Sequence, residues 1–125
     1  MTANPATPLE TALAYHRAWT SGDFELAMTY VADDIVCQAP AGTLEGADAF
    51  RQFMEPFTKI LTSSRLMAAF GDEEKAVVMY DTDTIPVGDA PGAECLTVRE
   101  GRIRHLRIIF DRLPFEVARG RQTPA

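Results

Sequence analysis

The chain has 125 residues, of which 46% are hydrophobic and 24% are charged, the composition of a single soluble globular domain. Its formal net charge of −6 at pH 7 argues against a nucleic-acid partner, because binding to a polyanion depends on a basic surface. No apolar run approaches the roughly 18 residues that a membrane span needs. The start of the chain, MTANPATP, has neither the basic nor the apolar region of a secretory signal. We therefore expect a cytoplasmic protein with no membrane partner.

Helical periodicity marks three segments in the first half of the chain. Apolar side chains recur at helical spacing from Leu9 to Thr20, and Gly22 ends this segment. Asp23 is a suitable N-cap for a short second helix. The third helix has a wide apolar face, which predicts that it packs on a sheet. The residues of that face are Phe50, Phe53, Met54, Phe57, Ile60 and Leu61.

Strand patterns dominate the second half. A short strand at residues 35–39 precedes the third helix, and four more follow it, separated by the turn sequences GDEE, GDAPG and EG. These four expected strands span residues 64–70, 75–87, 93–99 and 102–113. The order predicts an α+β fold in which three N-terminal helical segments wrap a curved, mostly antiparallel sheet. We expect one domain over residues 9–117, between a flexible arm at 1–8 and a flexible tail at 118–125.

The order of these elements also resembles a known superfamily. The stretch ALAYHRAWTSGDFELAMTYVADDIVCQAPAGTLEG joins a helix, S-G-D, a second helix, A-D-D, a strand and P-x-G, and EGRIRHLRIIFDRLPF follows as a closing strand. Over residues 9–115 this pattern resembles the nuclear transport factor 2-like superfamily, with its SnoaL-like polyketide cyclases, ketosteroid isomerases and limonene epoxide hydrolases. The resemblance implies a cone-shaped domain with an apolar pocket, acid/base chemistry on a carbonyl compound, and a homodimer formed through the outer sheet face.

The site residues of these relatives are matched only in part. The position of the ketosteroid isomerase general base is Ala39 here, while its oxyanion tyrosine corresponds to Tyr15 and its second oxyanion acid falls near Glu94. Of the acids in the epoxide hydrolase arrangement, one position corresponds to Asp83. The resemblance therefore implies a tyrosine and an acid in the pocket, but no complete family mechanism.

The strand at residues 75–87 supplies a candidate pair of acids. Alternation along a strand places Asp81 and Asp83 on one face, together with Met79, and places Tyr80 and Thr82 on the other. Two carboxylates about 6.7 Å apart in an apolar pocket repel each other, which raises the pKa of one toward the range useful for proton transfer. The alternative is that this face is the outer, solvated side of the sheet, where Arg99 or Arg107 pairs with the acids.

Glu94 is a second candidate acid. It shares a strand face with Leu96 and Val98. A carboxyl that is desolvated at the end of such an apolar row stays protonated and can donate a hydrogen bond to a developing oxyanion. The alternative is a carboxylate at the rim, beside a glycine turn.

The remaining candidate residues would bind a ligand. Tyr15 and Trp19 lie one helical turn apart, so both either project into the pocket or pack in the core. Gln38 is a candidate polar contact on the first strand. The expected ligand-binding residues besides Trp19 and Gln38 are Phe53, Phe57, Met79, Leu106, Ile108 and Phe110.

Cofactor and metal motifs have no support in the sequence. His16 and His105 are isolated from one another and from both cysteines, and there is no glycine-rich phosphate loop or nucleophile elbow. Two functions remain: a cofactor-free isomerase, cyclase or hydrolase acting on a small apolar carbonyl or epoxide compound, or a non-catalytic module of the same fold that binds a hydrophobic ligand or mediates dimerisation. The excess of ten arginines over two lysines hints at a GC-rich bacterial genome.

Overall fold

The computed structural model describes residues 7–85, 87–118 and 120. In chain order the elements are α1 (Pro8–Thr20), α2 (Phe24–Met28), β1 (Val31–Ala39), β2 (Gly42–Glu45), α3 (Ala47–Ile60), β3 (Leu61–Gly71), β4 (Lys75–Thr84), β5 (Ala90–Arg99), β6 (Arg102–Phe110) and α4 (Leu113–Ala118). None of the helices in the described part of the chain is long and apolar enough to cross a membrane.

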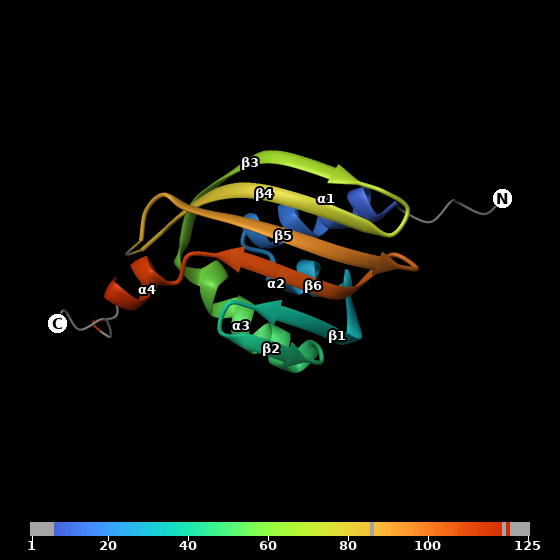
Figure 1. Ribbon diagram of the computed structural model, residues 1–125, viewed down its shortest axis with the longest axis horizontal. Coiled ribbons are helices and arrows are strands. Elements are labelled where there is room, and N and C mark those ends of the chain that lie inside the picture. Colours follow the sequence, from blue (N-terminus) through green and yellow to red (C-terminus); the bar gives the residue numbers. More distant parts are fainter. Residues whose placement is uncertain (1–6, 86, 119, 121–125) are drawn as a thin grey trace.

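The strands form one open, curved sheet in the order β2-β1-β6-β5-β4-β3 (Figure 1). Strands β3 to β6 pair antiparallel with their neighbours in the chain, as the short turns predicted. Strand β1 lies parallel to β6, and this pairing joins the N-terminal half of the chain to the end of the meander. The predicted α+β class and the mostly antiparallel sheet are confirmed.

The helices cover one face of the sheet, with α1 and α2 behind the strands in Figure 1. Thr7 and Glu10 form a capping box at the start of α1, which satisfies backbone N–H groups that the first turn leaves unpaired. The Asp23 side chain accepts a hydrogen bond of 3.0 Å from the backbone N–H of Leu26, so the predicted N-cap of α2 is confirmed.

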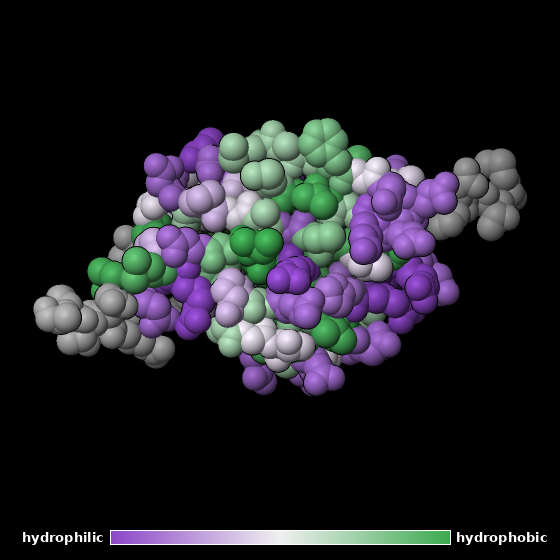
Figure 2. All heavy atoms as spheres, viewed as in Figure 1, coloured by the Kyte–Doolittle hydropathy of each residue, from purple (hydrophilic) through white to green (hydrophobic). Residues whose placement is uncertain are grey.

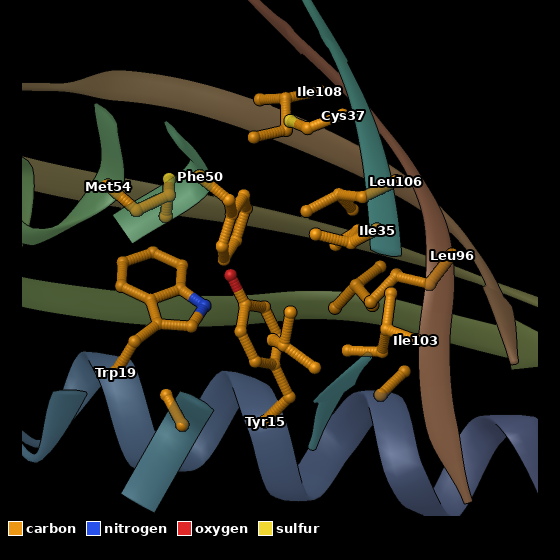
Figure 3. Packing of buried hydrophobic residues seen from close by; sticks show 14 of the residues in the cluster. Tyr15, Trp19, Ile35, Cys37, Phe50, Met54, Leu96, Ile103, Leu106 and Ile108 are labelled. Atoms are coloured by element: carbon orange, nitrogen blue, oxygen red, sulfur yellow. The ribbon is translucent and has the colours of Figure 1, made fainter. Parts of the chain in front are cut away.

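The core lies between the helices and the inner face of the sheet. Trp19, Tyr15 and Phe50 are its largest fully buried side chains, and Figure 3 shows them meeting between α1 and the strands. Burial alternates strictly along β4 from Lys75 to Tyr80, as expected for a strand with one face on the core and one in solvent.

Several boundaries differ from the prediction. β1 begins at Val31, four residues before the predicted strand at 35–39, and Asp33 and Asp34 lie within it, beside a register irregularity. β2 and α4 were not predicted, because β2 has only four residues and α4 has six, one of them a proline. Thr7 and Pro8 belong to the cap and first turn of α1. The rest of the predicted arm, residues 1–6, and residues 119 and 121–125 of the predicted tail lie outside the described residues.

Candidate active site

A cavity of about 550 Å³ lies between α3, the inner face of the sheet and α4. Its walls are mainly apolar. Phe53 and Phe57 come from α3, Ile108 and Phe110 from β6, and Phe115 from α4. The Phe115 ring packs 6.3 Å from the Phe57 ring and 5.7 Å from the Phe110 ring, so α4 is fixed beside the other two elements. The volume suits a small organic molecule.

Six of the eight predicted ligand-binding residues lie in the cavity wall or in the core. Phe53, Phe57, Ile108 and Phe110 line the cavity. The side chains of Trp19 and Leu106 are fully buried in the core cluster.

The cavity-facing positions predicted for Met79 and Gln38 are wrong. Met79 is 47% exposed and Gln38 is also exposed. Each of them alternates with a buried neighbour, Tyr80 or Cys37, that takes the inner face. Both side chains therefore point to the outer side of the sheet.

Asp81 and Asp83 also lie on the outer face, and the prediction that they face the cavity is wrong. Arg65 of β3 lies 3.4 Å from Asp83 and 4.0 Å from Asp81. The Ser63 hydroxyl and the backbone N–H of Asp89 donate to Asp83 at 2.7 and 2.8 Å. These hydrogen bonds hold the pKa of Asp83 below its ordinary value, and the bond from the Asp89 backbone has the largest effect. The alternative of a solvated, arginine-paired face is the observed one, with Arg65 in place of Arg99 or Arg107.

Arg112 and Glu116, which lie 3.8 Å apart, also line the cavity, but the buried acid in its wall is Glu94 of β5. Its side chain lines the cavity, yet the residue is only 2% exposed, so it is not a carboxylate at a solvated rim. The Tyr80 hydroxyl of β4 donates a hydrogen bond of 2.5 Å to Oε2 of Glu94. Within the described part of the chain, Oε1 of Glu94 accepts no hydrogen bond. One carboxyl oxygen is therefore held by the protein and the other is left for a ligand.

Burial controls the ionisation of this acid. Loss of hydration disfavours the charged form and raises the pKa of Glu94 to about 7, although the hydrogen bond from Tyr80 acts in the opposite direction. Burial, together with the charge of Glu94, raises the pKa of Tyr80 well above its ordinary value. At neutral pH the carboxyl therefore exists in both forms while the phenol keeps its proton.

Helix α1 brings further polar groups close to this pair. Tyr15 is fully buried, and burial followed by the charge of Glu94 raises its pKa well above the ordinary value. Among the described residues, the Tyr15 hydroxyl, Nε1 of Trp19 and Nδ1 of His16 have no hydrogen-bond partner. Figure 3 shows the Tyr15 hydroxyl and the Trp19 nitrogen directed into the core beneath Phe50. Tyr15 belongs to the core cluster and is not among the residues that line the cavity, but its hydroxyl is near enough to Glu94 for the carboxylate charge to act on its pKa.

His16 stays neutral near pH 7. Its ring lies 4.9 Å from the Tyr80 ring and 5.1 Å from the Trp19 ring. Burial, with a smaller effect of Arg17, lowers the pKa of His16 to about 4. In the described ranges, no three His, Cys, Asp or Glu side chains are grouped as ligands of a metal ion.

Tyr80 and Thr82 are the site residues that the sequence interpretation missed. Both line the cavity from β4, on the face opposite Asp81 and Asp83. The strand alternation had already separated these two sets. The signal that would have chosen between them is the run Ala76, Val78, Tyr80 of apolar side chains on one face, which marks that face as the buried one.

Comparison with known proteins places the chain in a family. Residues 12–106 match the SnoaL-like domain, and no curated protein compared with the sequence is similar to it. A crystal structure of a protein from Kribbella flavida DSM 17836 is 63% identical, with a TM-score of 0.89, over 91% of this chain and 94% of that one.

More distant structures share the fold. An NTF2-like protein of unknown function from Cytophaga hutchinsonii ATCC 33406 is 19% identical, with a TM-score of 0.76, over 92% of this chain and 98% of that one. A protein from Sinorhizobium meliloti provisionally named a polyketide cyclase is 20% identical, with a TM-score of 0.70, over 79% of this chain and 93% of that one. With the domain match covering most of the chain, the protein belongs to the SnoaL-like family and has an NTF2-like fold.

Proposed function

We propose that the protein is a cofactor-free acid/base enzyme of the isomerase or cyclase type, which acts on a small apolar carbonyl compound bound in the cavity. The observation that carries this proposal is Glu94, a buried carboxyl with a pKa of about 7 in a mainly apolar wall. An acid or base works best when its pKa lies near the working pH, because both protonation states are then populated.

The chemistry follows from the two oxygens of this carboxyl. With Oε2 held by Tyr80, the free Oε1 is the atom that takes a proton from the carbon next to the carbonyl group. The C–H bond breaks and its electron pair forms a C=C bond, the π pair of the carbonyl moves to its oxygen to give an enolate, and the proton stays on Glu94. Glu94 then returns the proton to a carbon of the same molecule, so no cofactor is consumed.

The enolate oxygen needs a hydrogen-bond donor in a site with little water. Tyr15 is one candidate: it is not among the residues that line the cavity, but its buried hydroxyl has no partner among the described residues and the charge of Glu94 acts on it. Tyr80 is a second donor if its hydroxyl turns from Glu94 to the ligand once Glu94 carries the proton. The phenylalanine rings of the walls supply apolar contact and exclude water from the reacting atoms.

Hydrogen exchange at carbon tests the proposal without knowledge of the natural substrate. Small apolar ketones are incubated with the protein in D₂O, and deuterium uptake next to the carbonyl is followed by NMR. We expect the wild type to accelerate exchange, Glu94→Gln to abolish the acceleration, and Tyr15→Phe to reduce it. Asp81→Asn is the matched control, since it makes the same acid-to-amide change on the outer face.

The same experiment separates the enzyme from the alternative of a hydrophobic-ligand-binding module. The apolar walls of the cavity favour binding whether or not chemistry follows. If the ketones bind, as line broadening would report, but wild type and Glu94→Gln exchange their protons equally slowly, Glu94 is not a catalytic base. The binding module is then the better assignment.

We further propose that the outer face of the sheet pairs with a second copy of the chain, as the family resemblance implies. Figure 2 shows apolar residues gathered on this face, and Phe70, Met79 and Ile109 are 72%, 47% and 60% exposed. Sedimentation of the wild type should show a dimer, and Met79→Asp should shift it to the monomer. Leu113→Asp, an equally exposed position on α4, is the control. A monomeric wild type would contradict the proposal.

A further inference from the structure

Gly92 is the cross-strand neighbour of Tyr80. The register of β4 and β5 makes Tyr80 and Gly92 Cα partners, and Glu94 lies two residues further along β5, on the same face. A phenol that is to reach Glu94 must therefore cross the backbone of Gly92. The short Tyr80–Glu94 hydrogen bond is a diagonal contact, made over a residue without a side chain.

The space above Gly92 is already filled by the Tyr80 ring. A Cβ atom built on Gly92 would lie 2.9 Å from Cε2, 3.0 Å from Cζ and 3.1 Å from the hydroxyl oxygen of Tyr80. Atoms this close must move apart, and the three atoms that clash form the end of the ring that carries the donor. Because Gly92 is not among the residues with a positive φ, alanine fits its backbone conformation, and the requirement is for space alone.

We infer that Gly92 is a positioning residue for the acid of this cavity: its missing side chain lets the Tyr80 ring lie across β5, and this sets the hydrogen bond to Glu94. The inference rests on the proposed function for its catalytic meaning. What it claims directly, however, is that Gly92 determines the Tyr80–Glu94 hydrogen bond and, through it, the pKa of Glu94. It assigns a role to a residue whose contribution is the absence of a side chain.

The test is a double-mutant cycle read by carboxyl ¹³C NMR, with the Glu94 signal assigned by its absence in Glu94→Gln. Because the bond from Tyr80 lowers the pKa of Glu94, we expect Gly92→Ala to raise this pKa by about one unit, and Tyr80→Phe to raise it similarly. In the Tyr80→Phe background, Gly92→Ala should have no further effect. Gly88→Ala is the matched control, since a Cβ there meets its nearest atom at an ordinary 3.7 Å.

Two results would overturn the inference. One is an unchanged Glu94 pKa in Gly92→Ala, and the other is an equal rise whether or not the Tyr80 hydroxyl is present. If Gly92→Ala does not fold, the same substitution is made together with Tyr80→Ala, which removes the ring. This double variant should be as stable as Tyr80→Ala alone, and a failure to fold would show that Gly92 is needed for a different reason. None of these measurements uses activity, so they stand or fall separately from the exchange experiment on the proposed function.

Discussion

The ionisation of Glu94 makes the stability of the fold depend on pH in a way that one substitution removes. Burial raises the pKa of Glu94 from 4.5 to about 7. Between these pH values the folded state binds more protons than the unfolded state, so the free energy of unfolding falls as the pH rises. At about 1.4 kcal/mol for each unit of pKa, the loss amounts to about 3 kcal/mol. It is complete above pH 7 and absent below pH 4.5.

Glu94→Gln keeps the shape of the side chain and an oxygen that can accept from Tyr80, but it does not titrate. We therefore expect the variant to gain about 3 kcal/mol relative to the wild type between pH 4 and pH 8. Any constant cost of the substitution cancels in this comparison, as do the other titrating groups.

Urea unfolding at each pH supplies the free energies. The single tryptophan, Trp19, is buried 5.5 Å from the Tyr80 ring and gives the fluorescence signal. The protein concentration must be held fixed, because dimerisation would add to the apparent stability. If the difference between variant and wild type is the same at pH 4 and pH 8, Glu94 titrates normally and the proposed acid/base role loses its basis.

Two further predictions concern the neighbours of this acid. Burial lowers the pKa of His16 from 6.5 to about 4. Between these pH values the unfolded state binds more protons than the folded state, so the free energy of unfolding rises with pH. His16→Phe should remove this rise of about 3 kcal/mol in the same urea experiments. Phe115→Ala should cost about 3 kcal/mol in urea unfolding at pH 7, because the ring is 8% exposed and packs on the cavity walls. Leu113→Ala, exposed on the same helix, should change stability by less than about 0.5 kcal/mol; equal losses would show that α4 contributes no specific packing.

Much of the fold could be predicted because periodicity and turn residues report local structure directly. The third helix repeats its apolar side chains over about three helical turns. Loops that contain glycine separate the long strands. The parallel pairing of β1 with β6 was not predicted, since it joins segments about 70 residues apart and no local pattern encodes it. α4 was not predicted because a helix of six residues is too short to show a helical repeat of apolar side chains.

The candidate site was predicted less well, and the error has one cause. Alternation along β4 correctly separated Asp81 and Asp83 from Tyr80 and Thr82, but it does not say which face is buried. The aspartates were preferred as catalytic candidates because two carboxylates on one face were expected to repel and raise one pKa, but their charge favours the solvated face, where they lie beside Arg65. On β5 the apolar row of Leu96 and Val98 identified the inner face correctly, and Glu94 was found with it.

The contrast between the two kinds of acid shows what raises a pKa in this fold. Asp81 and Asp83 lie on one strand face, where mutual repulsion was expected to raise one pKa, yet hydrogen bonds and Arg65 lower that of Asp83. Glu94 has no acidic neighbour on its strand and a strong hydrogen bond from Tyr80 that favours the charged form, yet its pKa reaches about 7. Removal from water therefore outweighs the hydrogen bond at the buried carboxyl, whereas hydrogen bonds prevail at the solvated one. A search for acids in this family should start from carboxyls on the apolar rows of the inner face, because a pair of acids in the sequence is as readily explained by a solvated strand.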